Sequence, residues 1–169
     1  MTDRETADIR GSIEQLAAGD ADRRAEAAER LCRAGSSAAQ AAVPLVRACA
    51  DDDDRVREWA VAALEELGPP ASSVLPQLIE LAASGHPLVA YWATTLLGRS
   101  GHDAAKAVPI LVKSLESAGD AAVAQRAVWA LGKIGPAAAG ARAALEKAAG
   151  GADPRLARLA REALDAIGT

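Results

Sequence analysis

The chain repeats itself with a nearly constant period. Five glycines follow short helix-like tails that open on leucine, "LCRAG", "LEELG", "LGRSG", "LGKIG" and "LDAIG", and they are Gly35, Gly68, Gly101, Gly135 and Gly168. Their spacings are 33, 33, 34 and 33 residues. A fixed period of this length is typical of a solenoid, in which each repeat is one supersecondary unit that stacks on its neighbours.

Each of these tails belongs to a helix with a marked start and a marked end. Fifteen residues before the glycines stand Asp20, Asp53, His86, Asp120 and Asp153. Aspartate is a favoured N-cap, and Pro87 and Pro154 take the first helical position in the third and fifth repeats. Glycine after a helix supplies the left-handed residue that ends it. The spacing predicts one helix of about 14 residues at the end of every repeat.

A second helical segment precedes each of these helices. The segments read "ADIRGSIEQLAA", "AQAAVPLVRACA", "SSVLPQLIELAA", "AKAVPILVKSLESA" and "AGARAALEKAAG", and three of them carry a proline near the start: Pro44, Pro76 and Pro109. One such helix pair cannot bury its apolar face alone, whereas five stacked pairs can. We therefore predict an all-α fold of five two-helix repeats in one domain over 1–169, with repeats at 8–35, 39–68, 72–101, 104–135 and 138–168.

Composition agrees with helix-on-helix packing. Half of the residues are hydrophobic, phenylalanine is missing, and only three tryptophans and one tyrosine are present. Alanine and leucine dominate instead, and the β-branched and aromatic runs of a sheet protein are missing.

The net charge of −4 argues against a general nucleic-acid binder. No apolar run reaches the roughly 18 to 20 residues that cross a bilayer. The charged N-terminus has no secretory h-region, so we expect a cytoplasmic protein, with Cys32 and Cys49 as free thiols.

The second helices share a sequence pattern, Asp-x-x-Val-Arg-x-x-Ala-x-x-Ala-Leu-x-x-Ile-Gly. It is clearest in "DDRVREWAVAALEELG" and "DAAVAQRAVWALGKIG". This pattern resembles short HEAT-like repeats of the phycobilin-lyase-related type, over roughly residues 9–168. The resemblance implies a right-handed α-α superhelix whose second helices line the concave side, and a family of mostly protein-binding scaffolds with scattered enzymes. Arg23 replaces the expected valine, and the last repeat lacks its first-helix proline, as capping repeats would.

All four aromatic residues fall on the second helices. On a wheel that starts at Val56 and steps by 100° per residue, the apolar stripe centres near 0° and Trp59 lies at about 300°. Trp92 takes the same phase in its own repeat, whereas Tyr91 and Trp129 lie at about 200° and 240°. These positions predict an aromatic strip on a binding face, because tryptophan and tyrosine dominate interface energetics. Alternatively, each ring covers an alanine-rich seam between repeats, and the sequence leaves both interpretations open.

The outward positions also change in charge along the chain. The early repeats offer Glu26, Glu29, Glu58 and Glu66, and the later repeats offer Arg99, Arg126, Lys133 and Arg158. An acidic, an aromatic and a basic region in succession suit a polar peptide or protein segment, and they do not suit a uniform polyanion. Ordinary solvated helix faces are the alternative explanation, since exposed helix positions are commonly charged.

No catalytic, metal or cofactor site emerges from the sequence. "DDDD" at 51–54 lacks the glycine and the distal glutamate of an EF-hand loop, and it suits a helix N-terminus. His86 sits at an N-cap and His102 in a loop, and neither begins a His-Glu pair. "LGKIG" is a helix end and not a phosphate loop.

We therefore predict a non-enzymatic interaction scaffold, a monomer or weak dimer, that binds a protein or peptide and neither nucleic acid nor membrane. A phycobilin-lyase-like chromophore-handling protein or enzyme is the alternative and would need convergent titratable groups in a pocket. A HEAT-like DNA-repair protein is less favoured and would need a basic concave face. The predicted contact residues on the concave face are Trp59, Tyr91, Trp92, Trp129, Glu58, Glu66, Arg99, Gln125, Arg126 and Lys133.

Overall fold

A computed structural model describes residues 3–117 and 119–168, and within them it contains ten α-helices and no strand. The helices are α1 (Asp3–Ala18), α2 (Ala21–Ala34), α3 (Ala42–Ala48), α4 (Asp54–Glu66), α5 (Leu75–Ala82), α6 (Pro87–Arg99), α7 (Val108–Glu116), α8 (Ala121–Ile134), α9 (Arg142–Ala149) and α10 (Pro154–Ile167). Four short 3₁₀ helices connect them: η1 (Gly35–Ala41), η2 (Ser72–Val74), η3 (Gly101–Ala107) and η4 (Gly135–Ala141). The all-helical prediction is confirmed.

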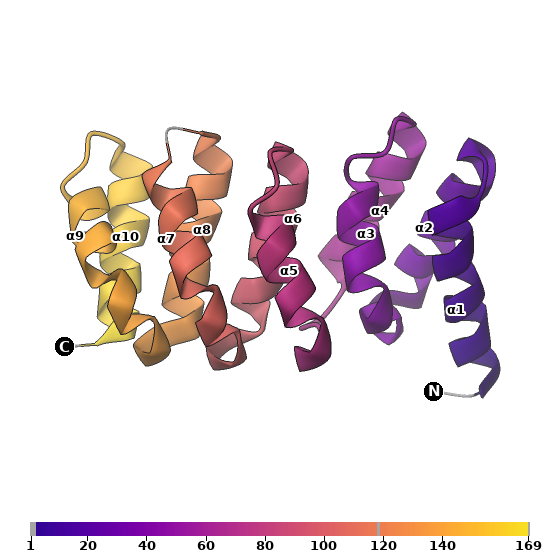
Figure 1. The fold of residues 1–169 in the computed structure, drawn as a ribbon, viewed down its shortest axis with the longest axis horizontal. Helices are drawn as coiled ribbons and strands as arrows, with labels where there is room; N and C mark the ends of the chain where they lie inside the picture. Colours follow the sequence, from indigo (N-terminus) through magenta and orange to yellow (C-terminus); the bar gives the residue numbers. More distant parts are fainter. Residues whose placement is uncertain (1–2, 118, 169) are drawn as a thin grey trace. The chain divides into compact units, whose positions relative to one another are not determined.

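The chain forms two compact units, an N-terminal unit (Met1–Val74) and a C-terminal unit (Leu75–Thr169). In the N-terminal unit α1 packs beside α2, and α3 packs beside α4 (Figure 1). In the C-terminal unit the pairs are α5 with α6, α7 with α8, and α9 with α10 (Figure 1). The second helices stack on one another within each unit, α2 on α4 in the first, and α6 on α8 and α8 on α10 in the second. Each unit is thus a stack of helix pairs, and one domain over 1–169 stays a prediction.

The helix starts follow the predicted caps. The carboxylates of Asp20, Asp53, Asp120 and Asp153 accept hydrogen bonds from backbone N–H groups in the first turns of α2, α4, α8 and α10. His86 stands at the N-cap of α6, but its side chain forms no capping bond there. Instead, the His86 N–H donates to Ser84 Oγ over 3.1 Å. Pro87 and Pro154 open their helices as expected.

Four of the five predicted glycine caps adopt a left-handed backbone, and the fifth does not. The φ angles of Gly35, Gly101, Gly135 and Gly168 are 52°, 54°, 69° and 80°. The prediction for Gly68 is wrong: α4 ends at Glu66, and Leu67 already has extended backbone angles, φ −70° and ψ 129°. Gly68 precedes Pro69, and the residue before a proline is driven out of helical conformations. The two prolines therefore end this helix.

The first helices of the second to fifth repeats are shorter than the sequence predicted, whereas α1 is longer. A seven-residue 3₁₀ helix precedes α3, α7 and α9, and each bends at one residue: Ala38, Ala104 and Ala138. These alanines are buried, with at most 1% of their surface exposed. A methyl side chain lets the backbone turn tightly against the core at these points. In these repeats the predicted first-helix segment begins in a 3₁₀ helix, and only its later part is α-helical.

The repeated leucine four residues before each glycine forms the core of the stack. Leu31, Leu64, Leu97 and Leu131 are fully buried or nearly so. Leu164, in the last repeat, is half-buried. The period seen in the sequence is therefore the period of the buried side chains.

In the N-terminal unit an ion pair joins the start of α2 to the loop before α4. Arg24 donates through Nε to Asp51 Oδ2 over 2.7 Å and through Nη2 to Asp51 Oδ1 over 2.8 Å. Asp51 also accepts the Asp53 N–H over 3.0 Å. The hydrogen bonds from Arg24 hold the pKa of the Asp51 carboxyl below its ordinary value of 3.8.

This ion pair predicts an acid-sensitive contribution to stability. Because the folded-state pKa of Asp51 is depressed, the contribution is complete above about pH 4 and is lost as pH falls through the folded value. We expect Asp51→Asn to lower the urea midpoint at about pH 7, and the deficit to be smaller at about pH 2. The exposed Asp52→Asn is the control and should change little at either pH. An Asp51→Asn deficit of equal size at both pH values would contradict the prediction.

The two cysteines differ in reactivity. Cys49 is fully buried, its Sγ donates to Leu45 O over 3.5 Å, and burial raises the pKa of its thiol to about 12. We expect Cys49 in the folded protein to hold roughly a thousandfold less thiolate than a free thiol, and to resist labelling until the chain unfolds. Half-buried Cys32 should label first. Reaction with a disulfide reagent in Cys32→Ser and Cys49→Ser, with and without denaturant, measures this, and equal rates in the folded variants would contradict it.

Candidate functional site

Six of the predicted contact residues form one continuous series of side-chain contacts on α6 and α8. We call it the aromatic–cationic cluster, and along the contacts it runs Arg99, Trp92, Tyr91, Arg126, Trp129 and Lys133. Three of its members lie on α6 and three on α8, so the cluster spans two neighbouring second helices of the C-terminal unit.

Arg126 is the centre of the cluster. Its guanidinium carbon lies 4.7 Å from the Tyr91 ring centroid and 4.9 Å from the Trp129 ring centroid, and its Nη2 donates to the Tyr91 hydroxyl. A guanidinium within about 6 Å of an aromatic face is attracted by the quadrupole of the ring. Arg126 is therefore held between two rings that come from different helices.

The outer members extend these contacts in both directions. Tyr91 and Trp92 meet edge to face, with centroids 5.6 Å apart and ring planes at 85°. Arg99 Cζ lies 5.9 Å from the Trp92 ring, and Lys133 Nζ lies 5.9 Å from the Trp129 ring. Helical periodicity explains the arrangement, because residues three, four or seven apart share one helix face. Arg126, Trp129 and Lys133 follow that spacing along α8.

Trp129 rests on a glycine of the neighbouring helix. A Cβ atom at Gly98 would lie 2.4 Å from Trp129 Cζ3 and 2.9 Å from Cε3, so only glycine leaves room for the ring. Gly132 takes the same place in the next repeat, where a Cβ would lie 3.2 Å from the Cα of Ala163. Sequence reasoning missed both residues. The available signal was a glycine inside two predicted helices at the same repeat position, where it costs about 1 kcal/mol relative to alanine.

The four aromatic residues differ in burial. Trp92 is only 6% exposed, so of the two interpretations that the sequence left open its burial favours a packed ring over one that projects outward. The wheel assumed one apolar stripe, whereas α6 is buried around most of its circumference. Tyr91 and Trp129 are half-buried, with one part packed and another part accessible. Trp59 is 36% exposed.

Three of the predicted contact residues belong to the N-terminal unit. Trp59, Glu58 and Glu66 are all exposed on α4. The aromatic–cationic cluster belongs entirely to the C-terminal unit. A surface that joins the two sets stays a prediction.

A hollow of about 280 Å³ adjoins the cluster between α8 and α10. Its lining residues are Tyr91, Ala122, Gln125, Arg126, Trp129, Arg155 and Leu159. We call it the Arg126 hollow. Gln125, predicted from its place on α8, lies here beside Arg126, whereas Arg155 and Leu159 of α10 were not predicted. A second hollow of about 280 Å³ shares Trp129 and Leu159 with it and extends toward Lys133 and Glu162.

The nearby carboxylates are already engaged. Asp153 caps α10 by accepting from the N–H groups of Arg155 and Leu156. These contacts, the backbone bond from Leu156 above all, lower the pKa of Asp153. Glu162 accepts from Arg158 Nη1 over 2.7 Å. None of the residues that line the Arg126 hollow is acidic.

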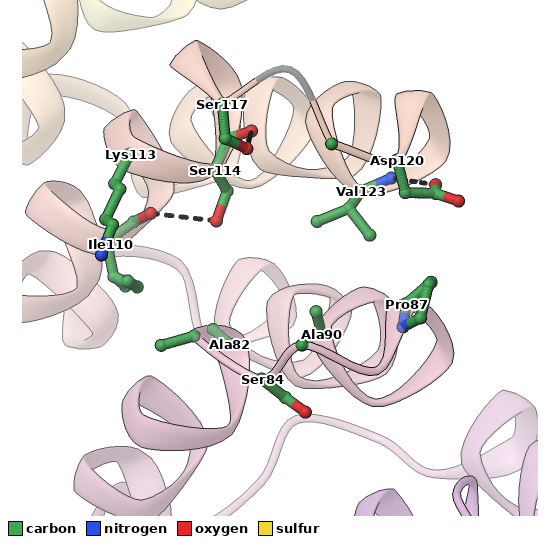
Figure 2. Close-up of a pocket in the computed structure, with 13 residues that line it drawn as sticks. Ala82, Ser84, Pro87, Ala90, Ile110, Lys113, Ser114, Ser117, Asp120 and Val123 are labelled. Atoms are coloured by element: carbon green, nitrogen blue, oxygen red, sulfur yellow. Dashed lines mark hydrogen bonds between the residues drawn. The ribbon is translucent and has the colours of Figure 1, made fainter.

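A third hollow, of about 240 Å³, lies between the third and fourth repeats, where Ala90 and Val123 face each other (Figure 2). Two of its polar side chains take part in local helix contacts. Ser114 Oγ donates to Ile110 O over 3.0 Å, and the Asp120 carboxylate caps α8 (Figure 2). Among the described residues, no hydrogen bond pairs one of its serines with Lys113 or Asp120.

Two other classes of site receive no support from the described residues. Residues 3–117 and 119–168 contain no group of three or more His, Cys, Asp or Glu side chains placed to hold a metal ion. In the same part of the chain, no helix combines the length and the apolar character needed to cross a membrane.

The stacked helix pairs define a helical-repeat protein. Residues 75–165 match the family model of HEAT repeats, which is more than half of the chain, so the chain belongs to the HEAT-repeat family. The predicted resemblance is confirmed. No curated protein matches the sequence.

Solved structures agree on the fold. An engineered protein is similar at 25% identity and a TM-score of 0.66, over 95% of this chain and 79% of its own. A designed armadillo repeat protein in complex with the peptide (KR)4 is similar at 22% identity and a TM-score of 0.67. The match covers 92% of this chain and 80% of that chain. The complex of CpcE and CpcF of phycocyanin lyase from Nostoc sp. PCC7120 is similar at 18% identity and a TM-score of 0.62. The match covers 94% of this chain and 98% of that chain. The last two likenesses concern the fold alone.

Proposed function

We propose that this protein is a non-enzymatic scaffold that binds a peptide or protein partner through the aromatic–cationic cluster. The observation that carries the proposal is Arg126, held between Tyr91 and Trp129 beside an open hollow. Arginine, tyrosine and tryptophan are the residue types that dominate binding energy at protein interfaces. Trp129 packs against Gly98, and Arg126 contacts both rings, so the three side chains are ordered before a partner arrives and less entropy is lost on binding.

The designed armadillo protein with its bound peptide supports the proposal by analogy, since stacked helix pairs of this kind can present a peptide-binding surface. The charge of the partner need not be the same. The phycobilin-lyase alternative is less favoured because the carboxylates that line the described hollows, Asp120 and Glu162, are engaged by a helix cap and by Arg158. Among the described carboxyl groups, those with a shifted pKa, Asp51, Asp53 and Asp153, are all shifted downward, as expected for paired carboxylates and not for a general acid.

Selection of peptides from an unbiased display library on the immobilised full chain tests the proposal. We expect the enriched peptides to bind Tyr91→Ala about tenfold or more weakly than the parent protein, because this change removes one ring of the Arg126 clamp. Lys147→Ala is the control, since Lys147 is exposed on α9, a first helix. Light scattering on the same samples monitors self-association. A library that yields no binder, or binders indifferent to Tyr91→Ala, would refute the proposed function.

A further inference from the structure

We infer that the Arg126 hollow binds a carboxylate side chain of an acidic peptide segment, with Arg126 and Arg155 as the recognising groups. The inference rests on the proposed partner binding and adds the chemistry of the partner. It starts from the way in which Arg126 is held, which differs from that of the ion-paired arginines of the chain.

Arg126 is fixed without being neutralised. Other arginines of the chain form ion pairs, such as Arg24 with Asp51 and Arg158 with Glu162. Within the described residues Arg126 forms no ion pair and contacts Tyr91 and Trp129 instead. Aromatic rings orient a guanidinium but carry no net charge, so its full positive charge remains. A guanidinium has five N–H donors in a planar fork, and the bond to Tyr91 uses one of them.

Arg155 adds a second cation to the same hollow. It lies in the first turn of α10 and is exposed. Its backbone N–H donates to Asp153, but in the described part of the chain its guanidinium forms no ion pair. Because Arg126 comes from α8 and Arg155 from α10, a carboxylate between them would contact two adjacent repeats.

The surroundings favour an anion over a cation. The two nearby carboxylates, Asp153 and Glu162, are occupied by a helix cap and by Arg158, respectively. Trp129 and Leu159 supply an apolar wall, which excludes water from one side and strengthens charge interactions. A volume of about 280 Å³ equals roughly nine water molecules and suits a side chain better than a large cofactor.

The distribution of charge favours an acidic peptide over a nucleic acid. Residues 1–74 hold nine basic and fifteen acidic residues, a net charge of −6, whereas residues 75–169 hold ten and eight, a net charge of +2. A polyanion requires many cations along its path, and a predominantly acidic chain repels it. A pair of cations in one hollow suits isolated carboxylates that alternate with uncharged residues.

Three synthetic peptides test the inference by fluorescence anisotropy with the full chain. They share a twelve-residue frame of glycine, serine and tyrosine and differ only in four positions, which are glutamate, glutamine or lysine. We expect the glutamate peptide to bind about tenfold or more tightly than the glutamine peptide, and the lysine peptide to bind most weakly. Raising the salt concentration should weaken the glutamate peptide selectively.

Matched variants locate the binding site. Arg126→Gln and Arg155→Gln should each reduce the affinity for the glutamate peptide by about tenfold and leave the glutamine peptide unchanged. Lys147→Gln, on α9, should have no effect. A thermal melt shows whether Arg126→Gln impairs folding. If it does, Arg155→Gln still tests the site, because Arg155 is exposed and its replacement should not disturb the fold. Tyr91→Phe, which keeps the ring but removes the hydroxyl bond, should weaken the glutamate peptide less than Arg126→Gln does.

The outcomes separate the inference from the proposed function. If library peptides bind in a Tyr91-dependent way but the glutamate and glutamine peptides bind equally, the acidic specificity is refuted and the scaffold function stands. If no peptide of either kind binds, both fail. If an oligouridine of equal length binds more tightly than the glutamate peptide and loses affinity in Arg155→Gln, the partner class is a nucleic acid and the inference is overturned.

Discussion

Replacing Gly98 with alanine is expected to destabilise the C-terminal unit by about 1–3 kcal/mol. The added Cβ would lie 2.4 Å from Trp129 Cζ3 and 3.0 Å from the Cα of Ala130. The tryptophan ring can move away, but the second contact is with the α8 backbone, which cannot move without separating the two second helices. Helix propensity alone predicts the opposite sign, because alanine is favoured over glycine by about 1 kcal/mol inside a helix.

Urea unfolding of Gly98→Ala and Gly140→Ala measures this effect. Gly140 lies in the same unit and has open space around its Cβ position, so its replacement should be neutral or stabilise by up to about 1 kcal/mol. The double variant Gly98→Ala with Trp129→Ala should be less destabilised than the sum of the single variants, because the ring that clashes is gone. Additive effects, or stabilisation by Gly98→Ala, would contradict the close packing of Trp129 on this glycine.

The same clash links stability to the candidate site. A displaced Trp129 ring no longer fixes one side of the Arg126 guanidinium, which lies 4.9 Å from it. We therefore expect Gly98→Ala to weaken partner binding although Gly98 itself contacts no partner. This effect distinguishes a preorganised cluster from side chains that simply meet on the surface.

Local signals in the sequence predicted the helical fold and most of its helix caps. An aspartate cap requires only its carboxylate and the backbone N–H groups two or three residues further along the chain. The four caps could therefore be predicted from single residues. The failure at Gly68 is also local, because the effect of Pro69 on the residue before it outweighed the preference of glycine for a helix end.

The candidate site was predicted only in part, because its contacts depend on two helices at once. A wheel for α8 placed Arg126 and Trp129 on one face, but it carried no information on the register of α8 against α6. That register brings Tyr91 into contact with Arg126, and it places Gly98 against Trp129. Arg155 was missed for the same reason, since its place in the Arg126 hollow depends on how α10 packs on α8.

Replacing Thr94 with valine is expected to stabilise the protein by about 1–2 kcal/mol. Thr94 lies on α6, is fully buried, and its Oγ1 has no hydrogen-bond partner in the part of the chain that the structure describes. A buried hydroxyl without a partner retains its full desolvation cost, and valine has nearly the same shape without that cost. Few point changes increase stability by this amount, so the sign alone is informative.

Thr95→Val is the matched control, because the neighbouring threonine is 3% exposed but satisfied. Its Oγ1 donates to Tyr91 O over 2.8 Å, so its loss should be neutral or destabilise by up to about 1.5 kcal/mol. Destabilisation of similar size in both variants would show that the Thr94 hydroxyl has a partner, such as an internal water.

Natural proteins retain unsatisfied buried groups chiefly where function needs them. Stabilisation without a change in peptide affinity would therefore exclude Thr94 from binding, whereas stabilisation with weaker binding would extend the candidate site into the interior of α6.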